Sequence, residues 1–390
     1  MKRLYIFIAL AIAFFSAQSQ TLEDILTQVA KNNKQLIAAE QQLQAQMLSN
    51  KTGLTPSDPE VSFGRMPAKN GGGKKTAWSV SQEIDFPTLY FARTKLAKLK
   101  NEQASVQFQM VRQEIMLETK TTFLQLVYLN KMQQVYQQRF SAIERLTQSL
   151  EKRLKAGDIS KLEVNKARLQ YIKSKNTLKQ NSSQLTKTQL ELTRLNGGKD
   201  IECNHLFFPE AELLQHDAIW NELQEADWLL RSSVLEEKIA RKQTSVARNE
   251  YLPSITIGVE SEKTPDEQFT GPRVGLRIPL WAKKNTIKAA KANERYQEAM
   301  LESYQMELKN QMEQQLNEAQ SAHNAMQEYQ QTLAALDNKA ILDKSLQLGH
   351  INTIEYLREL EWLYSANDEA IQLELNFHIA LAKLYRYKLK

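Results

Sequence analysis

The chain contains two related stretches that decide its fold. The first is Glu83-Ile84-Asp85-Phe86-Pro87, followed by a long segment and then by Ala156-Gly157-Asp158-Ile159. The second is Gly275-Leu276-Arg277-Ile278-Pro279, followed by a segment of the same length and then by Leu348-Gly349-His350-Ile351. The equal spacing from proline to glycine indicates an internal repeat, and a repeat determines the architecture of the whole chain.

Long helices are predicted between these landmarks. The segments from proline to glycine contain no further proline or glycine, and an uninterrupted helix of that length is about 100 Å long. Apolar residues recur at steps of three and four, as in Ile143, Leu146 and Leu150, which is typical of a coiled-coil seam. Gly157 and Gly349 each predict a reversal, because glycine accepts the left-handed backbone of a helix end. Further helices are predicted over residues 21–50, 160–196, 217–249 and 350–387.

Short alternating segments interrupt the helices. In one of them Trp78, Val80 and Ile84 fall on one face, and Ser79 and Glu83 fall on the other. A period of two residues predicts a strand with one apolar face and one polar face. The same reasoning predicts four strands, at about 60–66, 77–86, 254–260 and 273–280, with loops at 67–75 and 265–272.

Residues 1–20 have the composition of a secretory signal peptide. Lys2 and Arg3 precede an apolar run, 4–15, that is too short to cross a bilayer, and the next residues are small enough for cleavage. We therefore expect an exported protein. Its mature chain would comprise a first repeat at 21–215 and a second repeat at 216–390.

Composition and motifs argue against several functions. The formal charge of +6 is spread along helix faces, which is typical of a solvated surface rather than a nucleic-acid-binding patch. The five histidines show no metal-ligand spacing, and the single Cys203 can form no internal disulfide. The sequence has no nucleophile elbow, phosphate-binding loop or zinc-protease motif. We therefore expect no catalytic residues, no metal, no cofactor and no nucleic-acid partner.

The four strands point to a membrane. Strands of about seven to ten residues suit a bilayer, which a tilted strand crosses in about 9–11 residues. A soluble sheet also alternates, but here the helices already use their apolar seams on one another. Hydrocarbon does not tolerate an open sheet edge, and four strands are too few to close a barrel. We therefore expect a barrel that is shared between subunits.

The repeated order of helix, strand, loop, strand, very long helix, glycine turn and helix resembles the TolC-like outer-membrane efflux proteins. The likeness covers essentially the whole mature chain and includes local motifs at 81–87, 155–160 and 277–281. It implies a fold that is mainly α with membrane β. It further implies a trimer whose 12-strand outer-membrane β-barrel continues into a 12-helix periplasmic α-barrel.

The resemblance also assigns roles to the two turns, which would form the periplasmic mouth. In this family, acidic residues six positions after the turn glycine can constrict the closed mouth, and here those residues are Glu163 and Glu355. Both also fit a solvated helix face. Arg358 stands where a family member carries a second acid, so a salt bridge from Arg358 to Glu355 is an alternative to an acidic ring. The turn residues expected to dock a periplasmic adaptor (membrane-fusion) protein are Ala156, Gly157, Asp158, Leu348, Gly349 and His350.

The polar strand faces would line the barrel. The barrel-lumen candidates are Glu83, Asp85, Arg273 and Arg277. Glu83 and Asp85 are close enough in sequence to suggest paired carboxylates, but a polar lining is the ordinary expectation for a lumen.

These inferences favour the outer-membrane exit duct of a tripartite efflux or type I secretion system, and not an enzyme. It would form a homotrimer. Its other partners would be a periplasmic adaptor, an inner-membrane pump of the RND or ABC type, and outer-membrane lipid. The strand end at 82–87 loosely resembles outer-membrane partners of heavy-metal-cation pumps. The alternative is a periplasmic coiled-coil scaffold without a transmembrane barrel. The four strands, with Trp78, Phe86 and Trp281 at their ends, argue for the duct.

Overall fold

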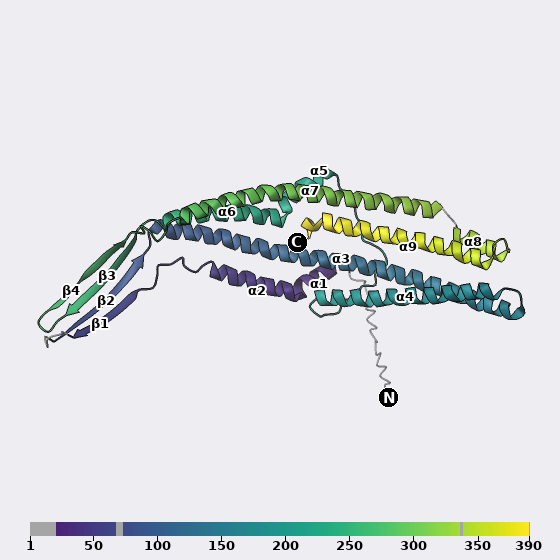
Figure 1. The fold of residues 1–390 in the computed structure, drawn as a ribbon, viewed down its shortest axis with the longest axis horizontal. Helices are drawn as coiled ribbons and strands as arrows, with labels where there is room; N and C mark the ends of the chain where they lie inside the picture. Colours follow the sequence, from purple (N-terminus) through teal and green to yellow (C-terminus); the bar gives the residue numbers. More distant parts are fainter. Residues whose placement is uncertain (1–20, 68–72, 336–337, 390) are drawn as a thin grey trace, which may run out of the picture. The chain divides into compact units, whose positions relative to one another are not determined.

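The computed structural model describes residues 21–67, 73–335 and 338–389, so the predicted signal peptide lies outside the described residues. The described chain is mostly helical and contains one antiparallel sheet (Figure 1). The chain divides into two units, each of which contains parts of both predicted repeats. The helical unit comprises residues 21–34, 115–213 and 318–383, and the sheet unit comprises residues 35–114, 214–317 and 384–389.

The elements follow the order that the repeat predicts. The helices are α1 (Leu22–Asn32), α2 (Lys34–Ser49), α3 (Pro87–Ala156), α4 (Lys161–Leu195), α5 (His216–Ala226), α6 (Trp228–Asn249), α7 (Thr286–Ala335), α8 (Asn338–Gln347) and α9 (Thr353–Leu384), with a short 3₁₀ helix at Arg386–Lys388. The strands are β1 (Glu60–Pro67), β2 (Lys74–Ile84), β3 (Ser254–Lys263) and β4 (Gln268–Arg277).

Two helices predicted as continuous are each split by a buried polar residue. The helix predicted over 21–50 is divided into α1 and α2 at Asn33, whose side chain donates to the carbonyl oxygen of Leu195 at 2.8 Å. The helix predicted over 217–249 is divided into α5 and α6 at Asp227, which caps the start of α6. Both predictions were wrong because these side chains bind backbone groups, which favours helix ends over helix interiors.

The longest helix of the chain is α3, which is unbroken over 70 residues. Its sequence lacks the proline and glycine that would interrupt it. The corresponding helix of the second repeat was predicted to run without interruption to Leu348. It is described as α7 and α8, and residues 336–337 between them lie outside the described residues.

The core of the helical unit lies along α3. Apolar side chains of α3 are completely or almost completely buried, as are apolar side chains of α4 and α9. This core includes Leu124, Leu126, Val127, Met132, Ile143, Leu192, Leu195, Leu375 and Leu381. Burying one such side chain contributes roughly 1.5–3 kcal/mol, so the long helices depend on this packing more than on their intrinsic propensity.

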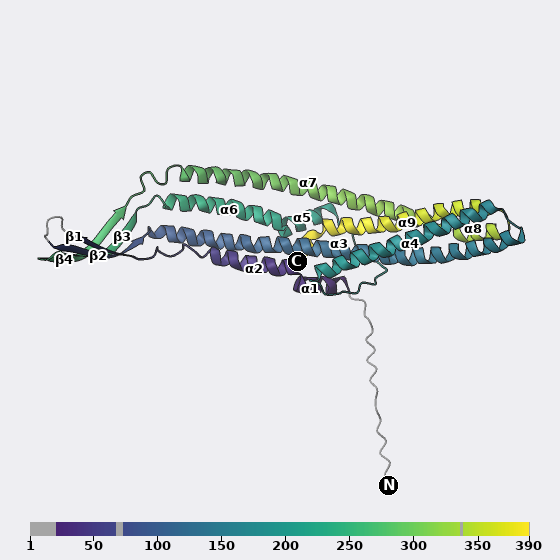
Figure 2. The same cartoon turned by 60° about the horizontal axis from the view of Figure 1, so that its bottom comes forward.

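The sheet has the order β1-β2-β3-β4, and all neighbouring strands are antiparallel (Figures 1 and 2). Its central pair, β2 and β3, joins the two repeats. The boundaries of β4 differ from the prediction, since residues 268–272 are paired with β3 although they were predicted as a loop. Residues 278–280, predicted as strand, lie beyond its end. Pro272 lies in β4, which is an edge strand of the sheet within this single chain.

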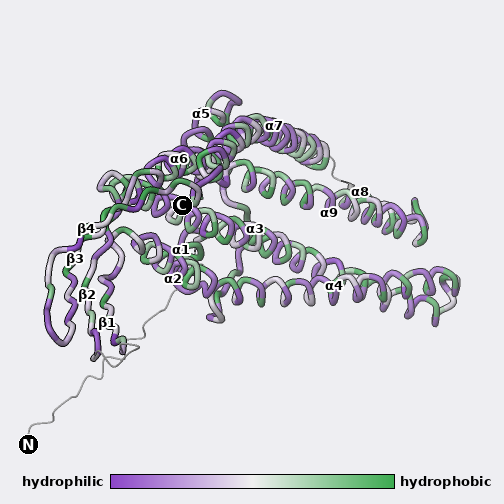
Figure 3. Tube along the Cα trace, turned by 60° about the vertical axis from the view of Figure 1, so that its left-hand side comes forward, coloured by the Kyte–Doolittle hydropathy of each residue, from purple (hydrophilic) through white to green (hydrophobic). Residues whose placement is uncertain are grey.

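One face of the sheet is apolar and exposed. Residues that pair across the strands share a face, as Val61, Val80 and Val259 do. Apolar and polar residues alternate along the strands (Figure 3). The exposed apolar side chains of this face are Val61, Phe63, Trp78, Val80, Ile255, Ile257, Val259, Val274 and Leu276. An apolar surface of this extent marks a contact with a membrane or with another protein.

Residues near the C-terminus form hydrogen bonds and ion pairs at and beside Asp227, within the sheet unit. This carboxylate is only 3% exposed and accepts a hydrogen bond from the hydroxyl of Tyr304 at 3.0 Å. The guanidinium of Arg386 lies 3.5 Å away. Next to it, the hydroxyl of Tyr387 donates to Glu222 at 2.9 Å. Burial, reinforced by Asp227, raises the pKa of Tyr304, so the hydroxyl stays protonated and continues to donate.

Candidate functional site

The two glycine turns have the same backbone geometry. Gly157 has a φ of +83° and Gly349 has a φ of +75°, a region that other residues rarely adopt. In the first turn the N–H of Asp158 donates to the carbonyl of Arg153 at 3.0 Å, and in the second His350 donates to Ser345 at 2.9 Å. These bonds end α3 and α8 in the manner of a Schellman motif. The predicted reversals are therefore confirmed at both positions.

The two acidic residues after the turns cap the helices that follow. The carboxylate of Glu163 accepts from the N–H of Ser160 at 3.0 Å, and the N–H of Glu163 donates to the Ser160 hydroxyl at 3.3 Å. Glu355 forms the same reciprocal pair with Asn352, at 3.1 and 2.9 Å. Each pair is a capping box, which satisfies backbone donors at a helix start. Helix capping thus explains why both acids stand at the same distance from their glycines.

Side chains from both turns pack into one cluster. Its buried members include Ile143 and Leu150 of α3, Val164 of α4, and Tyr356 and Leu360 of α9. Within the second hairpin, the hydroxyl of Tyr356 donates to Asp343 at 2.7 Å. The sequence prediction missed this cluster, although the apolar spacing of α3 was a signal for it.

The Glu163 carboxylate is connected to both hairpins. Its hydrogen bond from the backbone of Ser160 lowers the pKa of Glu163, and the side chain of Thr353 at the start of α9 acts in the same direction. Thr353 is buried. One carboxylate therefore caps α4 and contacts the first residue of α9.

Arg358 does not form the salt bridge that was considered for it. Its guanidinium lies 3.1 Å from Glu359, while the carboxylate of Glu355 accepts from the backbone of Asn352. Among the described residues, the pair between Glu355 and Arg358 is therefore not formed. Because Glu355 is held at the helix start, its carboxylate points back along α9 and away from the next turn.

We expect Glu163→Ala and Glu355→Ala to destabilise the turns by about 1 kcal/mol each, the usual net value of the one hydrogen bond that each carboxylate accepts from the helix start. Glu163→Gln should cost only a few tenths of that, because glutamine also completes a capping box. The lowered pKa of Glu163 adds a pH dependence: its contribution is present above the ordinary carboxyl pKa and is lost as pH falls through the lowered value. Thermal unfolding of the purified protein at several pH values measures these effects, and equal losses for alanine and glutamine would contradict capping.

The charged residues predicted for the lumen lie on or beside the polar face of the sheet. Glu83 lies 2.7 Å from Arg277 and accepts from the hydroxyl of Ser254 at 2.6 Å. Arg273 lies 3.6 Å from Glu260, a partner that the sequence did not suggest. Glu83 therefore has its ionic and hydrogen-bond partners within its own sheet.

Asp85 has a different surrounding from Glu83. It follows the end of β2, and its carboxylate lies 3.0 Å from the guanidinium of Arg93 in α3. Arg93 also lies 3.7 Å from Glu250, near the end of α6. These ion pairs connect the end of the sheet to its adjoining helices within the sheet unit.

Within the described residues, no helix is both long and apolar enough to cross a membrane. In the same part of the chain, no three His, Cys, Asp or Glu side chains are grouped so that they could hold a metal ion.

A family model described as outer membrane efflux protein matches residues 25–198 and again residues 220–387. The chain belongs to the outer membrane efflux protein family. The family model therefore matches the chain in two separate segments. This family consists of transport proteins rather than enzymes, and it locates the chain in the bacterial outer membrane.

Solved structures of outer-membrane channels share the fold of this efflux family member. A membrane protein from Pseudomonas aeruginosa aligns with a TM-score of 0.78 at 15% identity, covering 94% of this chain and 89% of that chain. VceC, an outer membrane protein of Vibrio cholerae, aligns with a TM-score of 0.77 at 13% identity, covering 94% and 95%. CusC, described as forming a transmembrane channel, aligns with a TM-score of 0.76 at 14% identity, covering 94% and 91%. No curated protein sequence matches the chain.

Membership in this efflux family decides between the two functions considered from the sequence. It favours an efflux channel over a coiled-coil scaffold, and it agrees with the exposed apolar face of the sheet. The positions of the turns and of the charged strand residues are then the features on which a more detailed function can be built.

Proposed function

We propose that this protein is the exit duct of a tripartite efflux system, a trimer that docks a periplasmic adaptor and an inner-membrane pump. The observation that carries this proposal is the sheet, which combines an exposed apolar face with two edge strands, β1 and β4. In hydrocarbon an unpaired edge leaves backbone donors and acceptors unsatisfied, at several kcal/mol each. The edge strand β4 of one copy therefore pairs with β1 of the next.

Three copies supply 12 strands in this proposal, which is within the range of known outer-membrane barrels. The polar face with Glu83, Arg273 and Arg277 then lines the lumen, and the apolar face meets lipid. Below the barrel, the long helices of the three copies form the periplasmic tunnel.

Native mass spectrometry of the detergent-extracted protein tests this assembly. We expect a trimer and no folded monomer in the membrane fraction. A stable, membrane-inserted monomer would overturn the proposal, because a barrel cannot close from the four strands of a single chain.

The turns around Gly157 and Gly349 form the docking end in this proposal. We expect Gly157→Pro and Gly349→Pro to leave membrane insertion intact but to reduce adaptor binding and efflux by at least about tenfold. Proline fixes φ near −65°, which is incompatible with these turns, and it removes the N–H donor of each glycine. Site-specific crosslinking to the adaptor in cells measures the binding.

Gly198→Pro is a matched control for these variants. Gly198 has a φ of +90° and donates to Thr193 at 2.9 Å, so proline causes a comparable local strain there. It lies at the opposite end of α4 from Gly157. If all three variants retain wild-type adaptor crosslinking, or if all three lose it equally, the turns are not the docking end.

We further propose that Glu163 and Glu355 narrow the resting mouth as rings of negative charge around the trimer axis. Negative charges at close range bind cations and repel one another. Glu163→Gln and Glu355→Gln keep the capping boxes but remove the charge, so they separate a gating role from a structural role. Increased conductance and reduced cation selectivity in planar bilayers support gating, whereas unchanged values leave both residues as caps.

The cargo that we propose is a heavy-metal cation. The strand end at 82–87 suggests the partner of a heavy-metal-cation pump. A deletion strain should then become more sensitive to metal cations than to organic drugs, and the intact gene should restore resistance. Sensitivity to drugs alone would reject the metal assignment and leave the exit duct intact.

A further inference from the structure

Beyond the end of β4 the chain forms an exposed loop at residues 278–285, which leads into α7. Its apolar side chains face solvent, since Ile278 is 57% exposed, Leu280 is 66% exposed and Trp281 is 81% exposed. Ile278 and Leu280 continue in sequence the alternation that places Leu276 on the apolar face of the sheet. The apolar surface therefore extends past the last strand pair as far as Trp281. We call residues 278–285 the Trp281 loop.

Hydrogen bonds and an ion pair hold the backbone of the Trp281 loop. The N–H of Lys284 donates to the carbonyl oxygen of Trp281 at 3.1 Å, which closes a turn. The ammonium group of Lys283 lies 2.8 Å from Glu250, next to the end of α6. The hydroxyl of Tyr251 donates to the carbonyl oxygen of Lys283. The loop is therefore attached to its neighbours through Lys283, while the side chain of Trp281 stays uncovered.

Lysines follow Trp281 at the entry to α7. Lys288 and Lys291 are three residues apart and so lie on the same side of the helix, and Lys284 comes just before its start. All three are exposed, and none has an ionic partner among the described residues. Residues 278–293 contain no acid. Because a helix N-terminus carries partial positive charge, lysines there do not stabilise the helix. A negative partner outside the chain explains their position better.

The start of α3, in the same unit, repeats this combination. Phe91 is 70% exposed. Lys95 and Lys98 follow it at steps of four and three, which places all three side chains on one side of the helix. Both lysines are exposed, and residues 87–101 contain no acid. The two long helices that follow the sheet therefore both begin beside an exposed aromatic side chain and exposed lysines.

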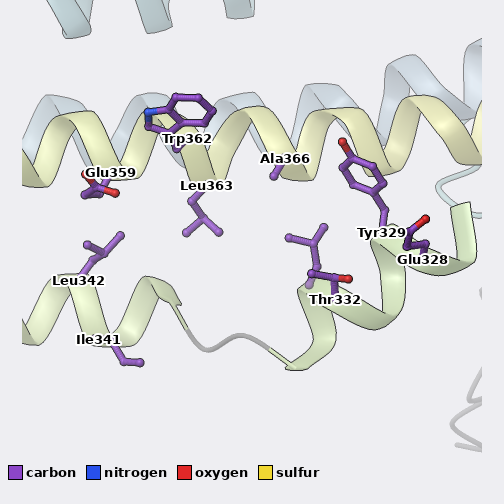
Figure 4. A pocket seen from close by; sticks show the side chains of 10 residues that line it. Glu328, Tyr329, Thr332, Ile341, Leu342, Glu359, Trp362, Leu363 and Ala366 are labelled. Atoms are coloured by element: carbon purple, nitrogen blue, oxygen red, sulfur yellow. The ribbon is translucent and has the colours of Figure 1, made fainter. Parts of the chain in front are cut away.

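Another exposed tryptophan, Trp362, has different surroundings. It is 72% exposed and lines a pocket of about 630 Å³ between α7, α8 and α9 of the helical unit (Figure 4). The charged residues of that pocket, Glu328 and Glu359, are both acids. A negatively charged lipid surface would repel these acids, whereas it would attract the lysines that follow Trp281. Trp362 is therefore a matched comparison for Trp281.

We propose that the Trp281 loop and the start of α7 bind the headgroup of an anionic phospholipid, such as phosphatidylglycerol, in the periplasmic leaflet of the outer membrane. This inference rests on the proposed duct and deepens it by naming the lipid that the duct selects. Leu280 and Trp281 insert at the edge of the hydrocarbon, where indole rings are favoured. The apolar stems of Lys284 and Lys288 lie along this surface, and their ammonium groups bind the phosphate.

The position of the lysines selects the leaflet. The apolar face of the sheet meets lipid in the proposed duct, and α7 leads from the sheet toward the periplasm. Lys288 and Lys291 lie on α7, beyond Trp281 in that direction. Their ammonium groups therefore reach the headgroups on the periplasmic side, and a lipid with net negative charge fits them better than a zwitterionic lipid does.

Native mass spectrometry of the reconstituted protein tests the headgroup site. The protein is placed in nanodiscs of phosphatidylethanolamine with and without phosphatidylglycerol, and the lipids retained by the released trimer are counted. Wild type should retain phosphatidylglycerol in preference to phosphatidylethanolamine. The triple variant Lys284→Gln, Lys288→Gln, Lys291→Gln should reduce this preference at least about fivefold, because glutamine removes the charge.

The triple variant Lys166→Gln, Lys175→Gln, Lys179→Gln is the matched control. These three residues are exposed lysines of α4, in the helical unit, and their loss should leave the lipid preference unchanged. An equal preference in all three proteins, or an equal loss in both variants, would overturn the proposal. So would displacement of phosphatidylglycerol by inorganic phosphate but not by chloride at the same ionic strength, because the site would then bind the free anion. A trimer without any lipid preference rejects the site and keeps the proposed duct, whereas the absence of any trimer rejects both.

Fluorescence quenching tests the position of Trp281. The emission that is lost in Trp281→Phe isolates the signal of Trp281, and the emission that is lost in Trp362→Phe isolates the comparison signal. In vesicles of phosphatidylethanolamine and phosphatidylglycerol, lipids brominated close to the headgroup should quench the Trp281 signal more than lipids brominated close to the chain end. Neither lipid should quench the Trp362 signal. A Trp281 signal that no brominated lipid quenches places the loop outside the membrane and overturns the proposal.

Discussion

Replacing Val80 by arginine is expected to remove the protein from the outer membrane. Val80 lies in the middle of β2, on the exposed apolar face between Val61 and Val259. An arginine on the lipid face of a barrel costs roughly 2–4 kcal/mol at mid-depth. The proposed trimer carries three copies of the substitution, so the free-energy cost of inserting the trimer is about three times larger. The measurement is the amount of heat-resistant trimer in the outer-membrane fraction.

Ser81→Arg is the matched control for this prediction. Ser81 is the next residue along β2 and lies on the polar face, opposite Glu60 and Gly258. An arginine there would enter the aqueous lumen near Glu60, so insertion should stay close to wild type while the conductance changes. Equal losses for both variants would contradict the assignment of one face to lipid and the other to water.

Asp227→Ala is expected to destabilise the sheet unit by about 3 kcal/mol. The substitution removes the N-cap of α6, worth about 1 kcal/mol. It also leaves the buried hydroxyl of Tyr304 without its acceptor, at about 1–3 kcal/mol. Arg386 loses its partner as well. Thermal unfolding in detergent, together with protease sensitivity of the C-terminal residues, measures the effect.

Two milder variants test the same cluster. Asp227→Asn keeps a capping oxygen and an acceptor for Tyr304, so it should lose less than about 1 kcal/mol. Tyr304→Phe should lose about 1 kcal/mol, the usual net value of one hydrogen bond. If Asp227→Ala behaves like Asp227→Asn, the carboxylate does not organise this unit.

The periodicity of apolar residues and the spacing of proline and glycine were sufficient to predict the main helices and strands from the sequence. The alternation around Trp78 and Val80 identified β2, and the absence of proline and glycine identified α3. Both signals are local, since each depends on residues a few positions apart. The glycine turns were predictable for the same reason, because a positive φ at Gly157 or Gly349 is a property of a single residue.

Features that depend on distant partners were not predictable. Asn33 ends α1 while its side chain donates to Leu195, which is remote in sequence. The first half of β4 contains Thr270, Gly271 and Pro272. Glycine and proline are typical of loops, so the sequence did not indicate that this segment pairs with β3. In the candidate site, the sequence showed that Glu163 stands six residues after Gly157. The structural reason for this distance is the pair of hydrogen bonds between Glu163 and Ser160.

The pairing of β2 with β3 has a consequence for how the chain folds. Partner residues in the β1–β2 and β3–β4 hairpins are close in sequence, whereas the β2–β3 pair joins distant residues such as Ser79 and Glu260. Contacts between such distant residues are slow to form, because the intervening chain must lose its freedom first. Each hairpin can therefore form early, but the seam between them must wait for the second repeat. Until then the apolar strands are exposed to aggregation, so we expect a chain that ends before the second repeat to aggregate more readily than the full chain.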